Sequence, residues 1–337
     1  MAPIVSPKAR AARIGLALSG GGFRGLVHLG VMRAIEENGL PIDFLAGTSM
    51  GGLIAGAYGA GVPLDDIIAF AINTKILDVA SPDRSRHAIF DQRKMVPLFA
   101  KLLGNDKITF EELRIPVALT AVDLQTGELV VLDKGPLLPA MMATAALPLM
   151  FAPVQHNGRW LIDGGILNNV PFDIARSHGV DRVLAVSIEP HRDFVLEPPP
   201  GAQHSRGLSI GGLLRFGGDV AHWHTPFLIA ETGINLTQQR INHTRMDLCP
   251  PDMLLEVSLP GVGMLSADGG RIAIDAGYYA ALAHIDELKA LAAPPPPAWR
   301  ERWRCFSHRA RLAWRILRGP AYPMYPEARD QGPEIGD

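Results

Sequence analysis

A serine stands at the centre of Gly47–Gly51, which reads G-T-S-M-G and matches the pattern G-x-S-x-G. An apolar run precedes the segment and a helix-like stretch follows it, which is the setting of a nucleophile elbow. Gly47 and Gly51 leave room for the sharp bend, and the N–H groups that begin the helix favour negative charge near Ser49. An ordinary glycine-rich helix start is the alternative, because short motifs match by chance. The pattern favours Ser49 as a nucleophile.

A second glycine-rich segment, Gly20–Gly25 with the sequence G-G-G-F-R-G, also lies between a predicted strand and a predicted helix. The backbone N–H groups of Gly20, Gly21 and Gly22 would form a cradle for an anion at the helix start. That anion is either a dinucleotide pyrophosphate, because the segment satisfies G-x-G-x-x-G, or the oxyanion of an acyl-transfer intermediate. A dinucleotide-binding protein has no use for the elbow that follows, so the oxyanion is favoured.

A serine nucleophile needs a base that accepts its proton. None of the histidines after Ser49 stands in a clear strand-end turn with a paired acid. His222 and His224 flank a tryptophan in a region that is typical of a solvated loop, and two histidines are too few for a metal site. Asp163, in the sequence L-I-D-G-G, instead ends a short apolar run and could reach Ser49. The alternative for D-G-G is a simple turn, which the motif alone favours.

The elements that must position these residues alternate between short apolar runs and helix-like segments. This alternation predicts an α/β domain with a mainly parallel sheet covered by helices on both faces. From Pro190 to Met246 the pattern weakens, and a stretch rich in Pro, Gly and Ser predicts a long loop or mobile lid. The expected strands are Arg13–Ser19, Ile42–Ala46, Pro116–Ala121, Leu129–Leu132 and Val183–Ile188, and the expected helices are Gly25–Asn38, Leu53–Gly59, Asp173–Gly179 and Ala280–Leu291.

Composition limits the class of protein. Of 337 residues, 47% are hydrophobic and 20% are charged, which supports a packed core and excludes a disordered or fibrous chain. Lys and Arg number 32 against 34 acidic residues, so the net charge of −2 gives no general attraction to nucleic acid. Two cysteines, Cys249 and Cys305, are too few for a disulfide framework or a Cys-based zinc site. No apolar stretch reaches the roughly 18 to 20 residues of a membrane-spanning helix.

Three parts of the chain are expected. Residues 1–12 form a short tail, because the apolar run Ile14–Leu18 is too short for a signal peptide and leads into a glycine turn rather than a cleavage site. Residues 13–293 form the catalytic domain, with 190–246 as a possible lid or loop insertion. Residues 294–337 begin with four prolines, a stiff linker, and continue as a basic tail. These features predict a cytoplasmic protein.

Together the three motifs carry a family resemblance. The sequences G-G-G-F-R-G, G-T-S-M-G-G and D-G-G follow one another between Arg13 and Val186, the last of them within A-L-P-L-M-F-A-P-V and W-L-I-D-G-G-I-L-N-N-V-P. This trio resembles the patatin-like phospholipase family of serine acyl hydrolases, which includes plant patatin and neuropathy target esterase. The resemblance implies a three-layer patatin-like α/β sandwich, a modified α/β-hydrolase-like fold with a mainly parallel central sheet.

Carried onto this chain, the resemblance implies a Ser–Asp dyad that works without histidine, metal or cofactor. Ser49 is then the nucleophile and Asp163 the proton acceptor, and the N–H groups of Gly20–Gly22 and Met50 form the oxyanion hole. Arg24 either helps to hold this loop or a lipid phosphate, or is a plain surface residue at the helix start. The residues that support the motifs are Arg24, Gly25, Gly47, Gly51, Gly164 and Gly165.

The implied activity is hydrolysis of the acyl ester bonds of phospholipids or lysophospholipids. Two alternatives remain open. One is an esterase or thioesterase that uses the same dyad on small soluble esters, and the other is a membrane-associated regulatory scaffold with a silent site. A dinucleotide-binding protein is the least favoured alternative, and nucleic acid is not the expected partner.

The tail holds a candidate membrane contact. Trp299–Arg318 contains seven arginines and a single acid, with apolar residues three or four apart. This pattern predicts a basic amphipathic helix on an anionic lipid surface, where each basic residue contributes about 1 kcal/mol of binding free energy. The alternatives are a helix docked on the main body, or one bound to nucleic acid or to a protein partner.

Overall fold

The computed structural model describes residues 11–74, 81–82, 88–188, 221–260, 262 and 269–294. The described residues up to His243 and from Pro251 onward belong to one compact unit, and Thr244–Pro250 belong to another. The expected basic helix Trp299–Arg318 and the part of the predicted lid before residue 221 lie outside the described residues. Both stay predictions, and so do the domain boundaries that the sequence indicates.

A mixed β-sheet forms the centre of the fold, and in the described part of the chain it has eight strands. Each strand pairs with the next in the series β10 (Met253–Val257), β9 (Arg182–Ile188), β1 (Ile14–Leu18), β2 (Phe44–Gly47), β5 (Val117–Asp123), β8 (Arg159–Asp163) and β7 (Val154–His156). β6 (Leu129–Leu132) pairs with the other edge of β5. The pairs from β10 to β5 are parallel, whereas the pairs β5–β6, β5–β8 and β7–β8 are antiparallel. The prediction of a mainly parallel α/β sheet is confirmed.

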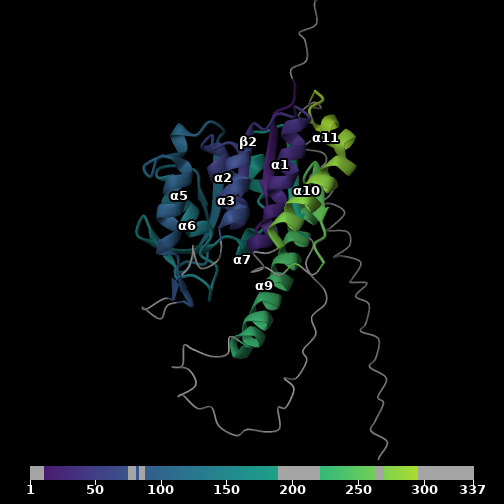
Figure 1. Cartoon of the computed structure of the whole chain (residues 1–337). Helices are drawn as coiled ribbons and strands as arrows, with labels where there is room; N and C mark the ends of the chain where they lie inside the picture. Colours follow the sequence, from purple (N-terminus) through teal and green to yellow (C-terminus); the bar gives the residue numbers. More distant parts are fainter. Residues whose placement is uncertain are drawn as a thin grey trace, which may run out of the picture. The chain divides into compact units, whose positions relative to one another are not determined.

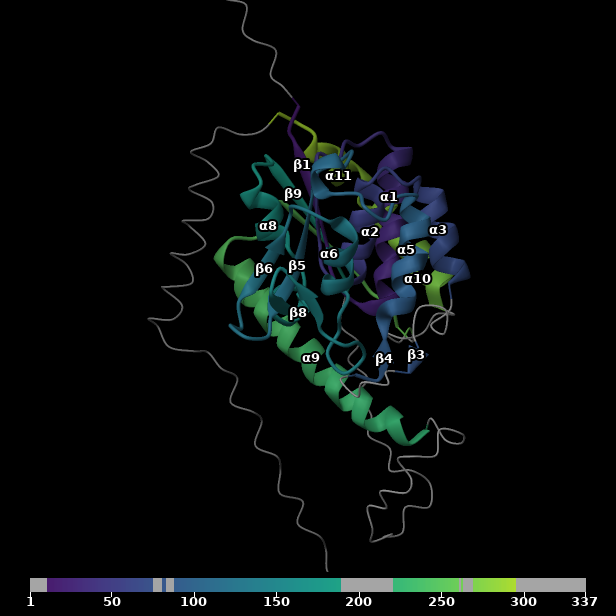
Figure 2. The ribbon, with the colours of Figure 1, turned by 90° about the vertical axis from the view of Figure 1, so that its left-hand side faces the viewer.

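Helices cover both faces of this sheet. On one face α8 (Phe172–Ser177) contacts β1, β2 and β9, and on the other α2 (Met50–Gly59) packs on β2 and β5. Figure 2 shows α8 on one side of the strands, and α2 on the other with α1 (Val27–Glu37), α3 (Leu64–Asn73) and α5 (Met95–Leu103). The other elements are α6 (Leu137–Thr144), α7 (Gly165–Asn168), α11 (Ile285–Leu291), η1 (Gly22–Leu26), η2 (Gln92–Lys94), η3 (Phe110–Glu112), and the small pair β3 (Ser81–Pro82) and β4 (Phe90–Asp91).

Glycine allows one helix crossing to be unusually close. α1 packs against α10 (Gly270–Ala283), and a Cβ placed on Gly30 would lie 1.8 Å from the Ile274 carbonyl oxygen. On the opposite helix, a Cβ on Gly277 would lie 2.0 Å from the Val27 carbonyl oxygen. Any larger residue would push the backbones apart, so these two glycines fix the position of α1 against α10.

The strand pairing explains how two distant segments meet. β2 and β8 both lie along the edge of β5 that faces away from β6. β2 runs parallel to β5 and ends at Gly47, opposite Leu119, whereas β8 runs antiparallel and ends at Asp163, opposite Ala121. The two strands therefore approach each other end to end, and the residues that follow β2 must meet the last residue of β8.

The structure differs from the sequence expectation at several helices. The span expected to be a loop or lid contains α9 (Ala221–Leu248) in its second half, a long helix that Figure 1 shows beside α7. The helix expected at Ala280–Leu291 begins earlier, at Gly270, and is interrupted at His284, which separates α10 from α11. The helix after the elbow begins at Met50 rather than Leu53. These differences leave the predicted strands in place.

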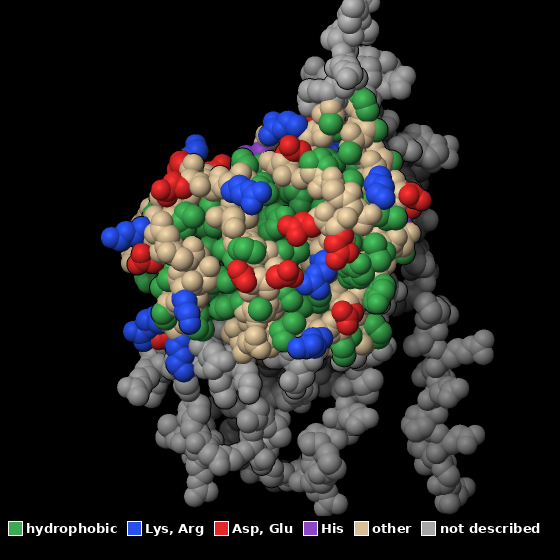
Figure 3. Space-filling view, turned by 45° about the horizontal axis from the view of Figure 1, so that its top comes forward, with side chains coloured by type: hydrophobic (Ala, Val, Ile, Leu, Met, Phe, Trp, Pro, Cys, Tyr) green, Lys and Arg blue, Asp and Glu red, His purple; other side chains and the backbone are tan. Residues whose placement is uncertain are grey.

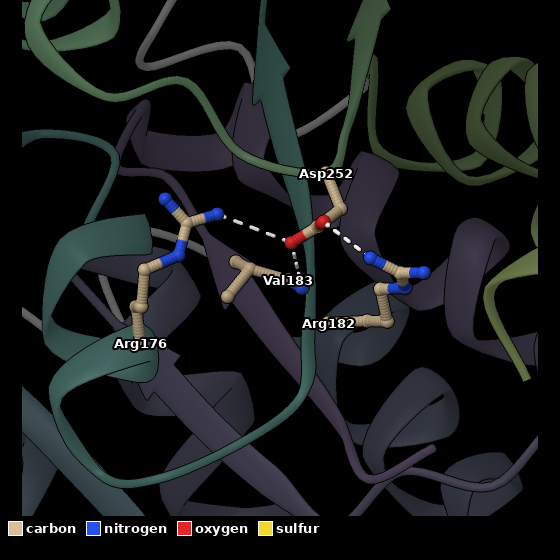
Figure 4. A network of polar contacts seen from close by, with 4 residues as sticks. All are labelled: Arg176, Arg182, Val183 and Asp252. Carbon is tan, nitrogen blue, oxygen red and sulfur yellow. Dashed lines mark hydrogen bonds and ion pairs between the residues drawn. The ribbon is translucent and has the colours of Figure 1, made fainter. Parts of the chain in front are cut away.

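A buried carboxylate holds the amino ends of β9 and β10 together (Figure 4). Asp252, just before β10, accepts hydrogen bonds from Arg176 Nη2 at 3.1 Å, Arg182 Nη1 at 3.2 Å and the Val183 N–H at 2.9 Å. Its side chain is 4% exposed. Two guanidinium groups and a backbone N–H thus satisfy this carboxylate, and it joins α8 to two strands.

On the face drawn in Figure 3, acidic and basic side chains are interspersed among apolar ones. In the part of the chain that the structure describes, no helix is long and apolar enough to cross a membrane.

Candidate active site

Ser49 lies in the turn between β2 and α2, as the motif predicts. It is one of three non-glycine residues with a positive φ among the described residues, at φ 55° and ψ −125°. A Cβ on Gly47 would lie 2.6 Å from the Gly51 carbonyl oxygen, and one on Gly51 would lie 2.4 Å from the Leu18 carbonyl oxygen. The Ser49 N–H donates to Thr144 Oγ1 at 3.0 Å. The turn is therefore strained and tightly enclosed, and only glycine fits on either side.

Asp163 is buried at the end of β8 and is 2% exposed. Its Oδ1 accepts the Gly165 N–H at 2.7 Å, and its carboxylate lines the same pocket as Ser49, close enough for the Ser49 hydroxyl to influence its pKa. Burial raises the pKa of this carboxyl to about 6, although the hydrogen bonds from Ser49 and Gly165 pull in the other direction. The structure thus brings the two predicted catalytic side chains together.

The residues after Asp163 leave little room for side chains. A Cβ on Gly164 would lie 2.2 Å from Thr120 Oγ1, and one on Gly165 would lie 2.9 Å from Gln238 Nε2. Glycine at Gly164 lets the chain turn directly against β5, and glycine at Gly165 admits the side chain of Gln238 from α9. The D-G-G motif is therefore a strand end that packs against its neighbours.

The glycine loop is held from several sides. The Gly20 N–H donates to the Asn169 carbonyl oxygen at 3.1 Å, so this amide already has an acceptor. Gly21 and Gly22 line the pocket beside Ser49, and Gly22 has a φ of 57°. A Cβ on Gly25 would lie 2.7 Å from the Met50 side chain, which brings η1 against the start of α2. The Gly20 N–H is therefore engaged elsewhere, which leaves Gly21, Gly22 and Met50 as the candidate oxyanion donors.

Arg24 is buried, at 6% exposed, so it is not the plain surface residue that the sequence left as an alternative. Its Nε–H donates to the Gly21 carbonyl oxygen at 3.4 Å, within the same loop. This contact supports the expectation that Arg24 helps to hold the loop.

An apolar pocket of about 150 Å³ opens beside the Ser49–Asp163 pair. Its polar residues are the pair, Gly21, Gly22, Thr74 and Asn169, with Asn235 and Gln238 from α9. Its apolar part comes mainly from three helices. The residues are Leu53, Ile54 and Ala57 of α2, Ile67, Phe70 and Ala71 of α3, and Met95, Phe99 and Leu102 of α5. The space fits a hydrocarbon chain whose polar end lies at Ser49.

Histidine takes no part in lining this pocket in the described residues. Within the same residues, no group of three or more His, Cys, Asp or Glu side chains could hold a metal ion. The arrangement instead offers a hydroxyl, a buried carboxylate and backbone N–H groups at a helix start, since the Met50 amide is the first of α2 and has no acceptor within the helix. This set can perform acyl transfer.

Several residues of the site were not foreseen. Thr144 accepts the Ser49 N–H, and Asn235 and Gln238 reach the pocket from a helix that the sequence pattern did not indicate. His28 lies fully buried behind the glycine loop, and it precedes Ser49 in the chain, whereas the candidate bases all follow Ser49. No residue pattern in the sequence signals its role, because that role depends on burial and on the contact with the Ser19 carbonyl oxygen.

The fold and the site define a class. A strained serine at a strand-to-helix turn, a glycine loop beside it and an aspartate at the end of β8 lie within residues 16–176, and the model of the family described as patatin-like phospholipase matches these residues. The chain therefore contains a patatin-like phospholipase domain, and the resemblance seen in the motifs is confirmed.

Individual proteins are similar to parts of this chain. An NTE family protein of Mycobacterium tuberculosis is 36% identical over 179 residues, which are 52% of this chain and 49% of the relative. Lysophospholipase NTE1 of Candida albicans is 27% identical over 184 residues, 52% of this chain and 13% of the relative. VipD from Legionella pneumophila, a solved structure, aligns at 14% identity with a TM-score of 0.46 over 91% of this chain and 75% of that chain. The chain spans about half the length of the mycobacterial relative.

Proposed function

We propose that the protein is a serine lipid acyl hydrolase that cleaves acyl ester bonds of phospholipids or lysophospholipids with Ser49 and Asp163. The observation that carries the proposal is the position of the buried Asp163 carboxylate beside the Ser49 hydroxyl at the polar end of an apolar pocket. The carboxylate can act as the base for the neighbouring hydroxyl, because burial raises its pKa and so makes it a stronger base.

In the first half of the reaction Asp163 accepts the Ser49 proton as Oγ attacks the ester carbonyl carbon. The carbonyl oxygen becomes an oxyanion, and the N–H groups of Gly21, Gly22 and Met50 donate to it. We leave Gly20 out of this set because its N–H is bound to Asn169. The tetrahedral intermediate then expels the alcohol, which takes the proton from Asp163, and the acyl group remains on Ser49.

In the second half water replaces the alcohol. Asp163 removes a proton from the water as it attacks the acyl carbon, and the same N–H groups stabilise the second oxyanion. Collapse of this intermediate releases the fatty acid and returns the proton to Ser49 Oγ. One carboxylate thus serves as base and then as acid in each half.

The apolar pocket supports a long acyl chain as the substrate group. Its walls contain no charged side chain apart from Asp163 among the residues that line it in the described structure. Each methylene that leaves water for such a wall contributes about 0.8 kcal/mol to binding. A small soluble ester would leave most of this surface unused, so we favour lipid over the esterase or thioesterase alternative.

The test is hydrolysis by the full chain, measured as free fatty acid released. The substrates are vesicles of phosphatidylcholine with phosphatidylglycerol, lysophospholipid micelles, and a short-chain soluble ester. We expect release from phospholipid or lysophospholipid that disappears in Ser49→Ala. Turnover of only the short ester would establish the esterase alternative, and absence of any Ser49-dependent turnover would favour the silent scaffold.

The membrane contact of Trp299–Arg318 and the cytoplasmic location stay predictions from the sequence. The basic, apolar-striped tail would bring the site to an anionic surface where its substrate lies. Co-sedimentation with anionic vesicles compares the full chain with a chain that ends at Ala293. Equal binding of the two would show that the tail is not the anchor.

A further inference from the structure

His28 is a buried side chain that the proposed mechanism does not use. It lies in the first turn of α1, is 0% exposed, and its Nε2 lies 2.8 Å from the Ser19 carbonyl oxygen. Burial lowers the pKa of its imidazole to about 4, so the ring is neutral at pH 7. Nδ1 is buried without a hydrogen-bond partner. Since Nε2 faces a carbonyl oxygen, which can only accept, the proton of the neutral ring is on Nε2.

Ser19 is the residue directly before the glycine loop, and its carbonyl belongs to the peptide unit that joins it to Gly20. In a trans peptide the C=O and the N–H point in opposite directions. Here the C=O accepts from His28 at 2.8 Å, and the N–H donates to the Asn169 carbonyl oxygen at 3.1 Å. Both polar groups of the peptide unit are thus hydrogen-bonded, the C=O to the side chain of His28 and the N–H to the main chain of Asn169.

Fixing this unit sets the direction in which the glycine loop begins. The next N–H groups along the chain are those of Gly21 and Gly22, which line the pocket beside Ser49. Glycine has a wide choice of backbone angles, so a run of three glycines would not hold two N–H groups in one direction by itself. α1, which carries His28, is in turn held against α10 by Gly30 and Gly277. A rigid helix therefore presents the donor that orients the loop.

We infer that His28 is a positioning residue for the oxyanion hole, which it orients by donating a hydrogen bond from Nε2 to the Ser19 carbonyl oxygen. The inference rests on the proposed function, because it assigns a role to His28 within the same site. His28 touches neither substrate nor Ser49; it acts through the Ser19–Gly20 peptide unit.

The test compares the full natural chain with His28→Leu, which removes the donor, and His28→Gln, whose amide can place an N–H near the position of Nε2. Val31→Ala is the matched control, because Val31 is buried on the same helix and its side chain makes no hydrogen bond. We expect kcat of His28→Leu to fall about tenfold or more with KM changed less than about twofold, and His28→Gln to recover most of it. Val31→Ala should lose stability but keep kcat per folded molecule.

A second readout separates orientation from packing. An acyl trifluoromethyl ketone forms an oxyanion adduct with a serine, whereas a non-cleavable ether analogue of the substrate does not. The inhibition constant of the ketone should rise in His28→Leu by the same factor as kcat falls, with the affinity for the ether unchanged.

The two proposals fail in different ways. If the natural chain shows no Ser49-dependent hydrolysis, the proposed function fails and the inference with it. If the natural chain is active but folded His28→Leu keeps kcat within about twofold, or loses affinity for ketone and ether alike, only the inference is overturned. If His28→Leu does not fold, His28→Phe replaces it, because phenylalanine fills a similar space and also lacks the donor. A tenfold lower kcat in folded His28→Phe at unchanged KM and unchanged ether affinity supports the inference, and natural kinetics in that variant overturn it.

Discussion

Two buried carboxylates lie at opposite ends of the sheet's parallel strands, and their partners differ in charge. Asp163 is 2% exposed, and the partners recorded for it in the described structure are neutral, the Ser49 hydroxyl and the Gly165 N–H. The side chain of Asp252 is 4% exposed and accepts from two guanidinium groups and the Val183 N–H (Figure 4). One carboxylate is thus held without a cation and the other with two.

The difference shows what distinguishes a candidate base from a structural brace. A cation beside a carboxylate stabilises its charged form and makes it a weaker base. Burial without a cation has the opposite effect, and it raises the pKa of Asp163 to about 6. The fold tolerates the uncompensated carboxylate at the site, whereas at the amino ends of β9 and β10 it neutralises a similar group. We therefore expect substitution at the two positions to have mirrored effects on turnover and stability.

The largest expected effect is the loss of turnover in Asp163→Asn, about 10⁴-fold in kcat, with Ser49→Ala at least as low. The amide keeps the shape of the carboxylate but cannot accept the Ser49 proton. Steady-state release of fatty acid measures the effect, and Asp252→Asn is the matched control that should keep its kcat per folded molecule. Comparable losses in the two Asn variants would erase the distinction between the two carboxylates.

For stability the order of the two Asn variants should be reversed, with Asp163→Asn affected less than Asp252→Asn. Because burial raises the pKa of Asp163, the stability that protonation contributes is fully present below the unfolded value of 3.8 and is lost as pH rises through about 6. At pH 8 Asp163→Asn removes a buried charge, so it should melt at the same temperature as the natural chain or higher.

Asp252→Ala should instead destabilise the fold by about 3 kcal/mol, the lower end for a broken buried ion pair, since Arg176 and Arg182 are partly exposed. Urea unfolding measures this free energy. Asp65→Ala is the control, because Asp65 pairs with Arg33 at the surface with its side chain 87% exposed and should matter by less than about 1 kcal/mol. Equal midpoints for Asp252→Ala and Asp65→Ala would show that Asp252 is not a brace.

The pH profile sharpens the account of Asp163. If its carboxylate is the base, kcat/KM should fall about tenfold for each pH unit below an apparent pKa near 6, and level off above it. Above about pH 5 the profile should be the same in His28→Gln, since burial lowers the pKa of His28 to about 4 and the imidazole is neutral there. A profile that is flat from pH 4 to pH 8 would show that no carboxyl with this pKa carries the reaction.

The smallest expected effect concerns the pocket wall. The rings of Phe70 and Phe99 pack edge to face with their centroids 5.2 Å apart, and both residues line the pocket. Phe99→Leu should enlarge the space and raise the preference for an acyl ester one methylene longer by about fourfold, the value of one buried methylene. Competition between esters whose acyl chains differ by one carbon gives the ratio. An unchanged ratio would indicate that the acyl chain does not enter between α3 and α5.

The elbow could be predicted from the sequence because its function depends on local geometry. Gly47, Ser49 and Gly51 occupy alternate positions of one five-residue segment, and the sharp turn demands those residue types at that spacing. The role expected of Asp163 came from a family resemblance, since D-G-G by itself favours a turn. Only the arrangement of β2 and β8 on one edge of β5 shows why its carboxylate lies next to Ser49, and no local pattern encodes that arrangement.

α9 and His28 were missed for different reasons. The apolar residues of Ala221–Leu248 do not form one stripe, so the helix lacks the periodic pattern that reveals a helix against a core. His28 is visible in the sequence, but its value depends on a peptide unit nine residues earlier and on burial, neither of which a residue type reveals. The motif likewise does not reveal that the Gly20 N–H is already engaged, because its acceptor is the main-chain carbonyl oxygen of Asn169, far away in the sequence.

The measurement that tests the central claim most directly is active-site labelling of the full chain with a fluorophosphonate, with the labelled peptide identified by mass spectrometry. It is carried out on the natural chain, Ser49→Ala, Asp163→Asn and Asp252→Asn in the presence of anionic vesicles. We predict an adduct on Ser49 that is absent in Ser49→Ala, forms far more slowly in Asp163→Asn, and forms at the natural rate in Asp252→Asn. An adduct on another residue, or equal labelling rates for the natural chain and Asp163→Asn, would contradict the Ser49–Asp163 dyad.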